Sequence, residues 1–297
     1  MSQATSIAPP VRRSAGRTTS RVQFGRLAGR AALYFLVTAF ALFMAQPFVW
    51  MVLTSLKELH EVHRIPVTWW PDNPLNFGNY VRIFTERPFW LYIVNSFVVA
   101  IGATLSTLLF STLAGYTFAK LPVPGKEILF TLVLATIMLP FEVSAIPLYL
   151  IFNKLGLVNT YLGLMAPELV SILGIFLIRQ FCETIPSDYL DAARIDGAGE
   201  VRVLWAVILP IITPALVTLA LIRFIATWNG FLWPLLITRD ETLRTLPLAL
   251  SFFSGYYGVQ YHLLAAAACV SVAPLLILFL VLQKQVVEGV ALSGLKG

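Results

Sequence analysis

Residues 191–210 read DAARIDGAGEVRVLWAVILP, a polar segment between two long apolar segments. Asp188 and Asp191 lie in the first turn of a predicted helix, where negative charge stabilises the positive end of the helix dipole. Gly197 is predicted to end that helix in the left-handed conformation, which glycine adopts without steric cost. The pattern therefore predicts a short polar helix over 188–198 that connects two apolar segments.

The surface of this predicted helix is low in relief. Ala192 and Ala193 carry small side chains, over which the cleft of a larger protein can close. Ser187, just ahead of the acidic residues, is the candidate N-cap. An ordinary amphipathic loop is the second interpretation, because a match to a local motif is only a hypothesis.

Composition places the chain in a membrane. Hydrophobic residues make up 58% of the sequence and charged residues 12%, whereas soluble domains carry about 25% charged residues. The mean hydropathy is +0.80. A window of about 20 residues, the length of a membrane-spanning helix, finds six apolar runs. They lie near 31–55, 91–118, 128–152, 162–180, 206–237 and 263–283.

The distribution of basic residues predicts the orientation. The first 30 residues carry six arginines and no acidic residue: Arg12, Arg13, Arg17, Arg21, Arg26 and Arg30. Positively charged segments stay in the cytoplasm, so six spans place both termini there and put 57–90, 153–161 and 238–262 outside. The predicted organisation is a disordered basic tail over 1–30, one six-helix domain over 31–283 and a cytoplasmic tail over 284–297.

Several kinds of site are disfavoured by the sequence. It contains no G-x-x-x-x-G-K-[ST] motif, so any ATP must be hydrolysed by another chain. The run from His60 to His63 is one residue short of the zinc-protease spacing H-E-x-x-H, and no metal site is predicted. Cys182 lies at a span end and Cys269 inside a span, so no disulfide is expected between them. No credible catalytic triad is visible, and the basic residues lack the interleaved aromatic residues that nucleic-acid binding uses.

The 191–210 segment resembles the EAA loop of permease subunits of binding-protein-dependent ABC importers, with Asp191 where that family usually has Glu. Further similarity lies in Trp69-Trp70-Pro71, in the run MLPFEVSAIPLYLIFNKLGLVNTYLGL from Met138, in FIATWNGFLWPLLI from Phe224, and in the terminal GVALSGLKG. These motifs resemble carbohydrate permeases of the maltose-transporter inner-membrane type. Gly230 departs from the pattern, because relatives often carry an acidic or amide residue after Trp-Asn.

The resemblance implies an all-α integral membrane protein with six transmembrane helices, a cytoplasmic coupling helix and the ABC type I importer permease fold. It implies a subunit without its own catalytic site in a bacterial-type inner membrane. The implied partners are a second homologous permease, two ABC ATPase subunits that hold ATP and Mg, and an extracytoplasmic solute-binding protein that delivers a sugar. The residues implied to couple the chain to the ATPase are Asp188, Asp191, Ala192, Ala193, Asp196, Gly197, Ala198, Leu209 and Pro210.

Polar residues inside apolar spans are costly, at about 2.5–3.5 kcal/mol for a charge at mid-helix, and they usually face the interior of a helix bundle. Glu142, between Pro140 and Pro147, either lines the translocation path or pairs with a neighbouring helix. Glu168 and Arg223 are predicted to be structural, Arg223 by pairing with a carboxylate or with backbone carbonyls. Asn229, Trp228 and Trp233 are candidates for stacking on a sugar and bonding its hydroxyls. Anchoring at the membrane interface is the alternative for the two tryptophans.

The outer segment between the last two apolar runs holds a second candidate contact. Gly255, Tyr256 and Tyr257 combine a flexible backbone with aromatic side chains. In the permeases that this sequence resembles, the corresponding loop reaches into the binding protein. An aromatic cluster at the membrane interface is the alternative.

Two other classes of function remain in view. An ABC permease for a non-sugar solute such as an amino acid shares the EAA-like loop. An ion-driven secondary carrier is disfavoured, because it would use buried titratable residues and often an internal repeat. A membrane enzyme would need a catalytic constellation near a membrane surface, and none is visible.

Overall fold

The computed structural model describes the backbone of residues 18–255 and 258–294 and the side chains of residues 29–253 and 259–283. The regular secondary structure of the described residues is helical apart from one short hairpin, in which β1 (Ser254–Gly255) pairs antiparallel with β2 (Gly258–Val259). The chain divides into two compact units, residues 1–50 and 51–297, where the sequence predicted one membrane domain over 31–283.

Helix α1 (Thr18–Ser55) begins earlier than predicted. Residues 18–30 are helical, although the sequence analysis assigned them to a disordered tail. Arginine, leucine and alanine favour helix and no proline lies in this stretch, so the helix of the apolar run continues upstream. The other end differs likewise, because α14 (Tyr261–Gly294) continues through 284–294, which was predicted to be a tail.

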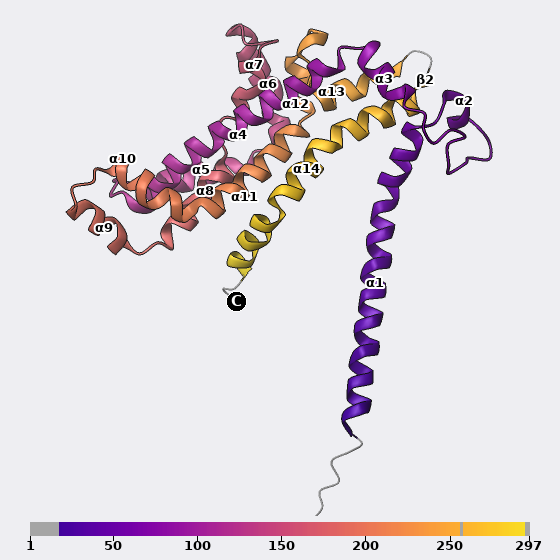
Figure 1. Ribbon diagram of the computed structural model, residues 1–297. Helices are drawn as coiled ribbons and strands as arrows, with labels where there is room; N and C mark the ends of the chain where they lie inside the picture. The colour runs from indigo at the N-terminus through magenta and orange to yellow at the C-terminus, as the bar shows by residue number, and fades with distance from the viewer. Residues whose placement is uncertain (1–17, 256–257, 295–297) are drawn as a thin grey trace, which may run out of the picture. The chain divides into compact units, whose positions relative to one another are not determined.

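Unit 51–297 is built on long helices that run alongside one another (Figure 1). Helix α4 (Phe89–Lys120) packs against α8 (Ile172–Glu183) and α11 (Leu209–Trp228), and α11 also packs against α14. Short helices join them. These are α2 (Leu59–Val62), α3 (Gly78–Thr85), α7 (Tyr161–Met165), α9 (Ser187–Ile195), α10 (Glu200–Val203), α12 (Leu232–Ile237) and α13 (Leu246–Leu250). The 3-10 segments are η1 (Thr136–Met138), η2 (Ala166–Glu168), η4 (Glu241–Leu243) and η5 (Ser251–Phe253), and η3 (Leu204–Ile208) is a π-helical turn.

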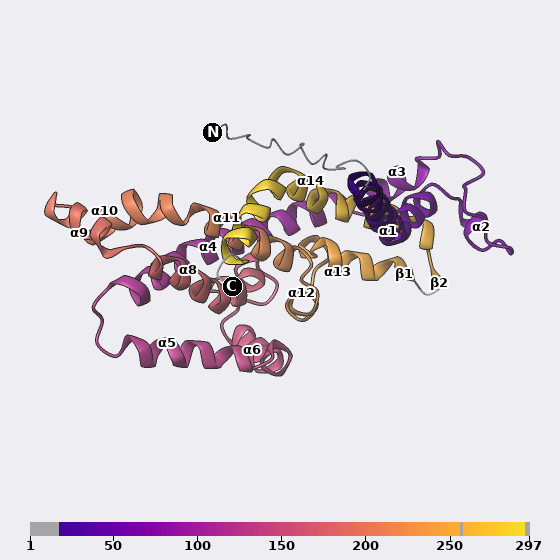
Figure 2. The same ribbon diagram turned by 90° about the horizontal axis from the view of Figure 1, so that it is seen from below.

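Two of the six predicted spans are bent. Helix α5 (Lys126–Ala135) with η1 meets α6 (Phe141–Lys154) at 99°, and α7 with η2 meets α8 at 46°. Figure 2 shows α5 along its length while α6 is seen nearly end-on. The described residues thus hold four helices long and apolar enough to cross a membrane, or up to six if each bent pair forms one span.

Prolines and capping explain these bends. Leu139 precedes Pro140 and is extended, because the proline ring excludes its predecessor from helical conformation. Pro140 then caps α6 with ψ of 136°. At the other bend Ser171 is the N-cap of α8, and its hydroxyl accepts a hydrogen bond from the Gly174 amide at 3.1 Å.

Loops predicted to share one side of the membrane contact one another. On the predicted outer side Arg87 pairs with Glu241 at 3.3 Å, and the Asn159 side chain donates to Asp240 at 2.6 Å. On the predicted inner side the Lys120 ammonium donates to the Ile185 carbonyl at 2.6 Å. The three sequence-predicted outer segments thus join through the 238–262 loop, in agreement with alternating spans.

Candidate functional site

Helix α9 forms where the polar segment was predicted. Pro186, not Ser187, is the N-cap, and no side chain caps the helix; Ser187 is its first residue. A proline fixes φ near the value a helix start needs, so the serine hydroxyl is not required there. Asp188 lies in the first turn, in agreement with the dipole argument. Asp191 does not, because the helix begins at Ser187 and Asp191 is its fifth residue.

Gly197 ends α9 in the left-handed conformation, with φ of 83°. The Gly197 amide donates to the Arg194 carbonyl at 3.0 Å, and the Ala198 amide donates to the Ala193 carbonyl at 3.0 Å. This pair of bonds is a Schellman motif, which satisfies carbonyls that the helix end would leave free. Ala193 and Ala198 also pack on the same core cluster, the apolar contact that usually accompanies the motif.

One face of α9 is anchored and the other is exposed. Leu190 is buried among residues of α4, α8 and α11, and full burial of a leucine contributes about 1.5–3 kcal/mol. The exposed face carries Asp188, Asp191 and Ala192 with two large apolar side chains, Tyr189 at 58% and Ile195 at 86% exposure. Apolar side chains so exposed beside carboxylates are typical of a protein contact surface.

A chain of polar contacts holds the end of α9 against the helix bundle. The Arg194 guanidinium donates to Asp191 at 3.0 Å and to Glu200 at 2.9 Å. The second oxygen of Glu200 accepts from the Tyr116 hydroxyl of α4 at 2.6 Å. The hydrogen bond with Glu200 raises the pKa of Arg194 above its ordinary value, so the guanidinium stays charged.

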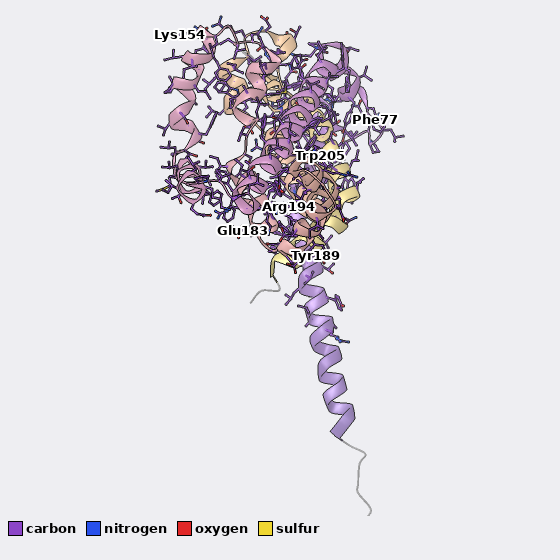
Figure 3. The ribbon with its side chains drawn as sticks, turned by 90° about the vertical axis from the view of Figure 1, so that its left-hand side faces the viewer. Phe77, Lys154, Glu183, Tyr189, Arg194 and Trp205 are labelled. Atoms are coloured by element: carbon purple, nitrogen blue, oxygen red, sulfur yellow. The ribbon has the colours of Figure 1, made fainter. Side chains whose placement is uncertain are left out.

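The predicted coupling residues thus fall into two groups. Seven of them lie on α9 or at its end, with Asp196 as the exposed C-cap. Leu209 and Pro210 do not join this surface, because they form the first turn of α11 beyond the π-helical turn. Leu209 instead lines an apolar groove of about 330 Å³ with leucines of α4 and with Trp205. Figure 3 labels Tyr189, Arg194 and Glu183 at one end of unit 51–297 and Lys154 at the other.

The candidate residues of the substrate path are dispersed. Trp228 is 1% exposed; its ring stacks on Phe224 at 5.6 Å, and its indole N–H donates to the Ser271 carbonyl at 3.2 Å. The prediction that Trp228 presents a ring to a sugar is therefore wrong for this conformation, because apolar packing outweighs exposure at the span end. Asn229 is exposed, and its amide donates to the Ile225 carbonyl at 2.9 Å.

Trp233 is also buried, at 4% exposure, and its N–H donates to the Gly163 carbonyl at 2.9 Å. Glu142 lies in the first turn of α6, just after the 99° bend, and its side chain is exposed. Within the described residues Glu142 makes no hydrogen bond or ion pair. No neighbouring-helix partner is therefore found among those residues, and the alternative of a path-lining role stays a prediction.

Arg223 pairs as the sequence predicted. Its guanidinium donates to the Glu168 carboxylate and, at 3.2 Å, to the Glu168 carbonyl. Thr107 of α4 donates to the same carbonyl at 3.0 Å, and Ser106 donates to that of Leu169 at 3.1 Å. These contacts satisfy backbone groups that the bend between η2 and α8 leaves free of helical bonds, as a membrane interior requires. No sequence pattern identified Glu168 as the partner, because the two residues are 55 positions apart.

The predicted outer segments hold a network that sequence reasoning missed. The Glu241 carboxylate accepts from the Tyr92 hydroxyl at 2.7 Å and lies beside Arg87 and Arg244. The hydrogen bond from Tyr92, with help from the two arginines, lowers the pKa of Glu241 below its ordinary value. Among the predicted binding-protein contacts, Gly255 lies in β1, whereas Tyr256 and Tyr257 lie outside the described residues.

The histidine-containing run of the predicted outer loop contributes His60 and Glu61 to a group of possible metal ligands. In the described residues His60, Glu61 and Asp72 bring possible ligand atoms within 4.8 Å of one another. Glu61 is buried, however, and its two oxygens accept from the amides of Glu58 at 3.4 Å and Asp72 at 3.0 Å. Asp72 pairs with Arg64 at 3.6 Å. Glu61 and Asp72 therefore stabilise the folded loop through these contacts.

Comparison with known proteins agrees with the fold. Residues 108–291 match the family model described as "Binding-protein-dependent transport system inner membrane component". The chain is 35% identical to the arabinooligosaccharides transport system permease protein of Halalkalibacterium halodurans, over 87% of this chain and 94% of that protein. It is 34% identical to the trehalose/maltose transport system permease protein of Thermococcus litoralis, over 84% and 91%.

A solved structure shows the same fold. A chain in the crystal structure of a bacterial ABC transporter involved in the import of the acidic polysaccharide alginate superimposes with a TM-score of 0.77 at 23% identity, over 91% of this chain and 99% of that one. With the family match spanning more than half of the sequence, these similarities place the protein in a membrane as a multi-pass helical subunit. The chain belongs to the family of inner membrane components of binding-protein-dependent transport systems.

Proposed function

We propose that this chain forms half of the translocation path of an ATP-driven importer for a carbohydrate. The observation that carries the proposal is α9, a short exposed helix with a fixed stop, anchored by Leu190 to the core of the spanning helices. The names of the relatives support the substrate class, because those proteins serve arabinooligosaccharides and trehalose or maltose.

The proposed mechanism depends on α9 moving as a rigid element. Two ATPase subunits, which hold ATP and Mg, bind α9 through Tyr189, Ile195 and the carboxylates beside them. Closure of the ATPase dimer displaces α9. Because Leu190 and the contact from Glu200 to Tyr116 tie α9 to the spanning helices, the displacement reaches α4 and α11. The spans then alternate between inward-open and outward-open arrangements, a rigid-body transition between two packed states.

The proposed partners complete the path. A second homologous permease supplies its other half, and an extracytoplasmic solute-binding protein delivers the sugar. The chain itself is proposed to hydrolyse no ATP, since its sequence holds no P-loop motif. Both termini are proposed to be cytoplasmic, because of the arginines before residue 31.

Reconstitution tests the function. Proteoliposomes that contain this chain, the second permease and both ATPase subunits should take up a neutral oligosaccharide only with ATP and the binding protein. Omitting the ATPase subunits should abolish uptake, whereas collapsing ion gradients should not change it. Uptake driven by an ion gradient without ATP would support a secondary carrier, and uptake of amino acids alone would support the non-sugar permease.

Reporter fusions test the orientation. A fluorescent protein that matures only in the cytoplasm should be active at both termini, and alkaline phosphatase, active only outside, should be silent at both. A fusion after residue 70 in the 57–90 segment should give the opposite pair of signals and serves as the internal control. An active phosphatase at the C-terminus would reject the six-span arrangement.

A further inference from the structure

A small pocket lies beside the bend between η2 and α8. Helix α12, which supplies part of its wall, contacts α6 and α7 (Figure 1). The volume of the pocket is about 190 Å³, below the ~300–1,000 Å³ of sites for drug-sized ligands. The space is therefore suited to a single ring. The lining residues are Val99, Phe141, Leu164, Glu168, Thr227, Gly230, Phe231, Leu232, Trp233 and Pro234.

The polar part of the wall has a free acceptor. One carboxylate oxygen of Glu168 accepts from Arg223 and, at 3.5 Å, from the Thr227 hydroxyl. The other oxygen has no partner among the described residues, and the side chain keeps 32% of its surface exposed. The wall thus offers an acceptor and a hydroxyl to a ligand, while the paired charges of Glu168 and Arg223 sum to zero.

The apolar part of the wall is aromatic. Phe231 is 42% exposed, so its ring is accessible from the pocket. Trp233 is held edge-on by Phe141 and Phe152, with ring centroids 6.0 and 5.2 Å away, and its N–H is already bonded to Gly163. Gly230 adds no side chain, and a Cβ there would lie 3.0 Å from the Thr227 carbonyl oxygen. The aromatic wall is therefore fixed and the space beside it stays open.

We infer that this pocket binds one neutral sugar ring of the transported carbohydrate. The hydroxyls of such a ring would donate to the free oxygen of Glu168 and bond to Thr227, while its C–H face would pack on Phe231. A neutral ring is favoured over an anionic one for two reasons. The Arg223 guanidinium is already paired with Glu168, and an anionic ligand would be repelled by the carboxylate oxygen of Glu168 that has no partner. This inference rests on the proposed function. The subsite would be the part of the translocation path that α11 and α12 form.

Transport by the complete reconstituted importer tests this subsite, with maltotriose and α-1,5-arabinotriose as neutral probes and glycerol 3-phosphate as the anionic one. The measured quantity is the amount of probe transported per ATP hydrolysed. Thr227→Val and Phe231→Ala should each lower this ratio at least fivefold. Thr227→Ser and Phe231→Tyr, which keep the hydroxyl and the ring, should restore it to within twofold of wild type.

Thr218→Val is the matched control, because Thr218 lies on the same helix, donates to the Pro214 carbonyl at 3.0 Å and does not line the pocket. Its ratio should equal that of wild type. If Thr227→Val and Phe231→Ala act only through packing, they should lower ATP hydrolysis and transport together and leave the ratio unchanged. That result would overturn the subsite. Preferred transport of glycerol 3-phosphate would overturn the neutral ring. Wild-type transport of none of the probes would contradict the proposed function itself.

Discussion

Replacing Gly197 by valine is expected to lower ATP-driven uptake at least tenfold while the protein still folds and inserts in the membrane. At φ of 83° a β-branched residue is strained by about 1–3 kcal/mol. A Cβ at this position would meet open space, so the strain comes from the backbone alone. To relieve it, residues 196–198 must leave the Schellman motif, and the end of α9 shifts away from its contact with Glu200.

Gly156→Val is the matched control for this prediction. Gly156 has φ of 69° and open space around its Cβ, and it ends α6 with the same pair of bonds, from the Gly156 amide to Asn153 at 3.2 Å and from the Leu157 amide to Phe152 at 2.9 Å. Valine at either position thus meets the same kind of backbone strain, but Gly156 is at the opposite end of the spanning helices. Uptake and co-purification of the ATPase subunits should stay within twofold of wild type. If Gly197→Val takes up substrate as fast as this control, α9 does not couple the chain to the ATPase subunits.

The sequence was sufficient to predict α9 because its signals are local. The acidic first turn and a glycine at the helix end each act within one turn of helix, so their meaning does not depend on distant residues. The anchoring of α9 is not local. Leu190 and the contact between Tyr116 and Glu200 join segments far apart in sequence, and only the folded chain brings these residues together.

Hydropathy located the spans but not their shape. An apolar window measures length and composition, and it gives no bend angle, although Pro140 signalled where the third span breaks. The role of Trp228 was misjudged for a related reason. Aromatic residues at a span end fit either the membrane interface or the core, and burial of Trp228 was decided by Phe97 and Phe224, which pack around it. The pocket beside Glu168 arises from helices α4, α6, α7, α11 and α12 and from η2, and no one of these segments carries a sequence signal for it.

Replacing Arg223 by methionine is expected to cause the largest loss of stability. Methionine keeps much of the side-chain length but removes the partner of the Glu168 carboxylate at the bend of the fourth span. Breaking a buried ion pair costs about 3–5 kcal/mol. Because 32% of the Glu168 side chain is exposed, solvent screens part of this, and we expect the low end of that range, about 3 kcal/mol. The thermal midpoint of the detergent-solubilised protein should fall clearly.

Two further variants separate the ion pair from general packing. The double variant Glu168→Gln/Arg223→Met leaves no charge without a partner. At least half of the stability lost in Arg223→Met should therefore return. A double-mutant cycle measures the coupling energy between the two residues. Arg202→Met is the control, since Arg202 is exposed and forms no ion pair within the described residues; surface changes of this kind usually stay within about 0.5 kcal/mol. If the double variant is no more stable than Arg223→Met, the guanidinium acts mainly through its bond to the Glu168 carbonyl. The bend between η2 and α8 would then depend on that backbone contact, together with those from Thr107 and Ser106, more than on the charge pair.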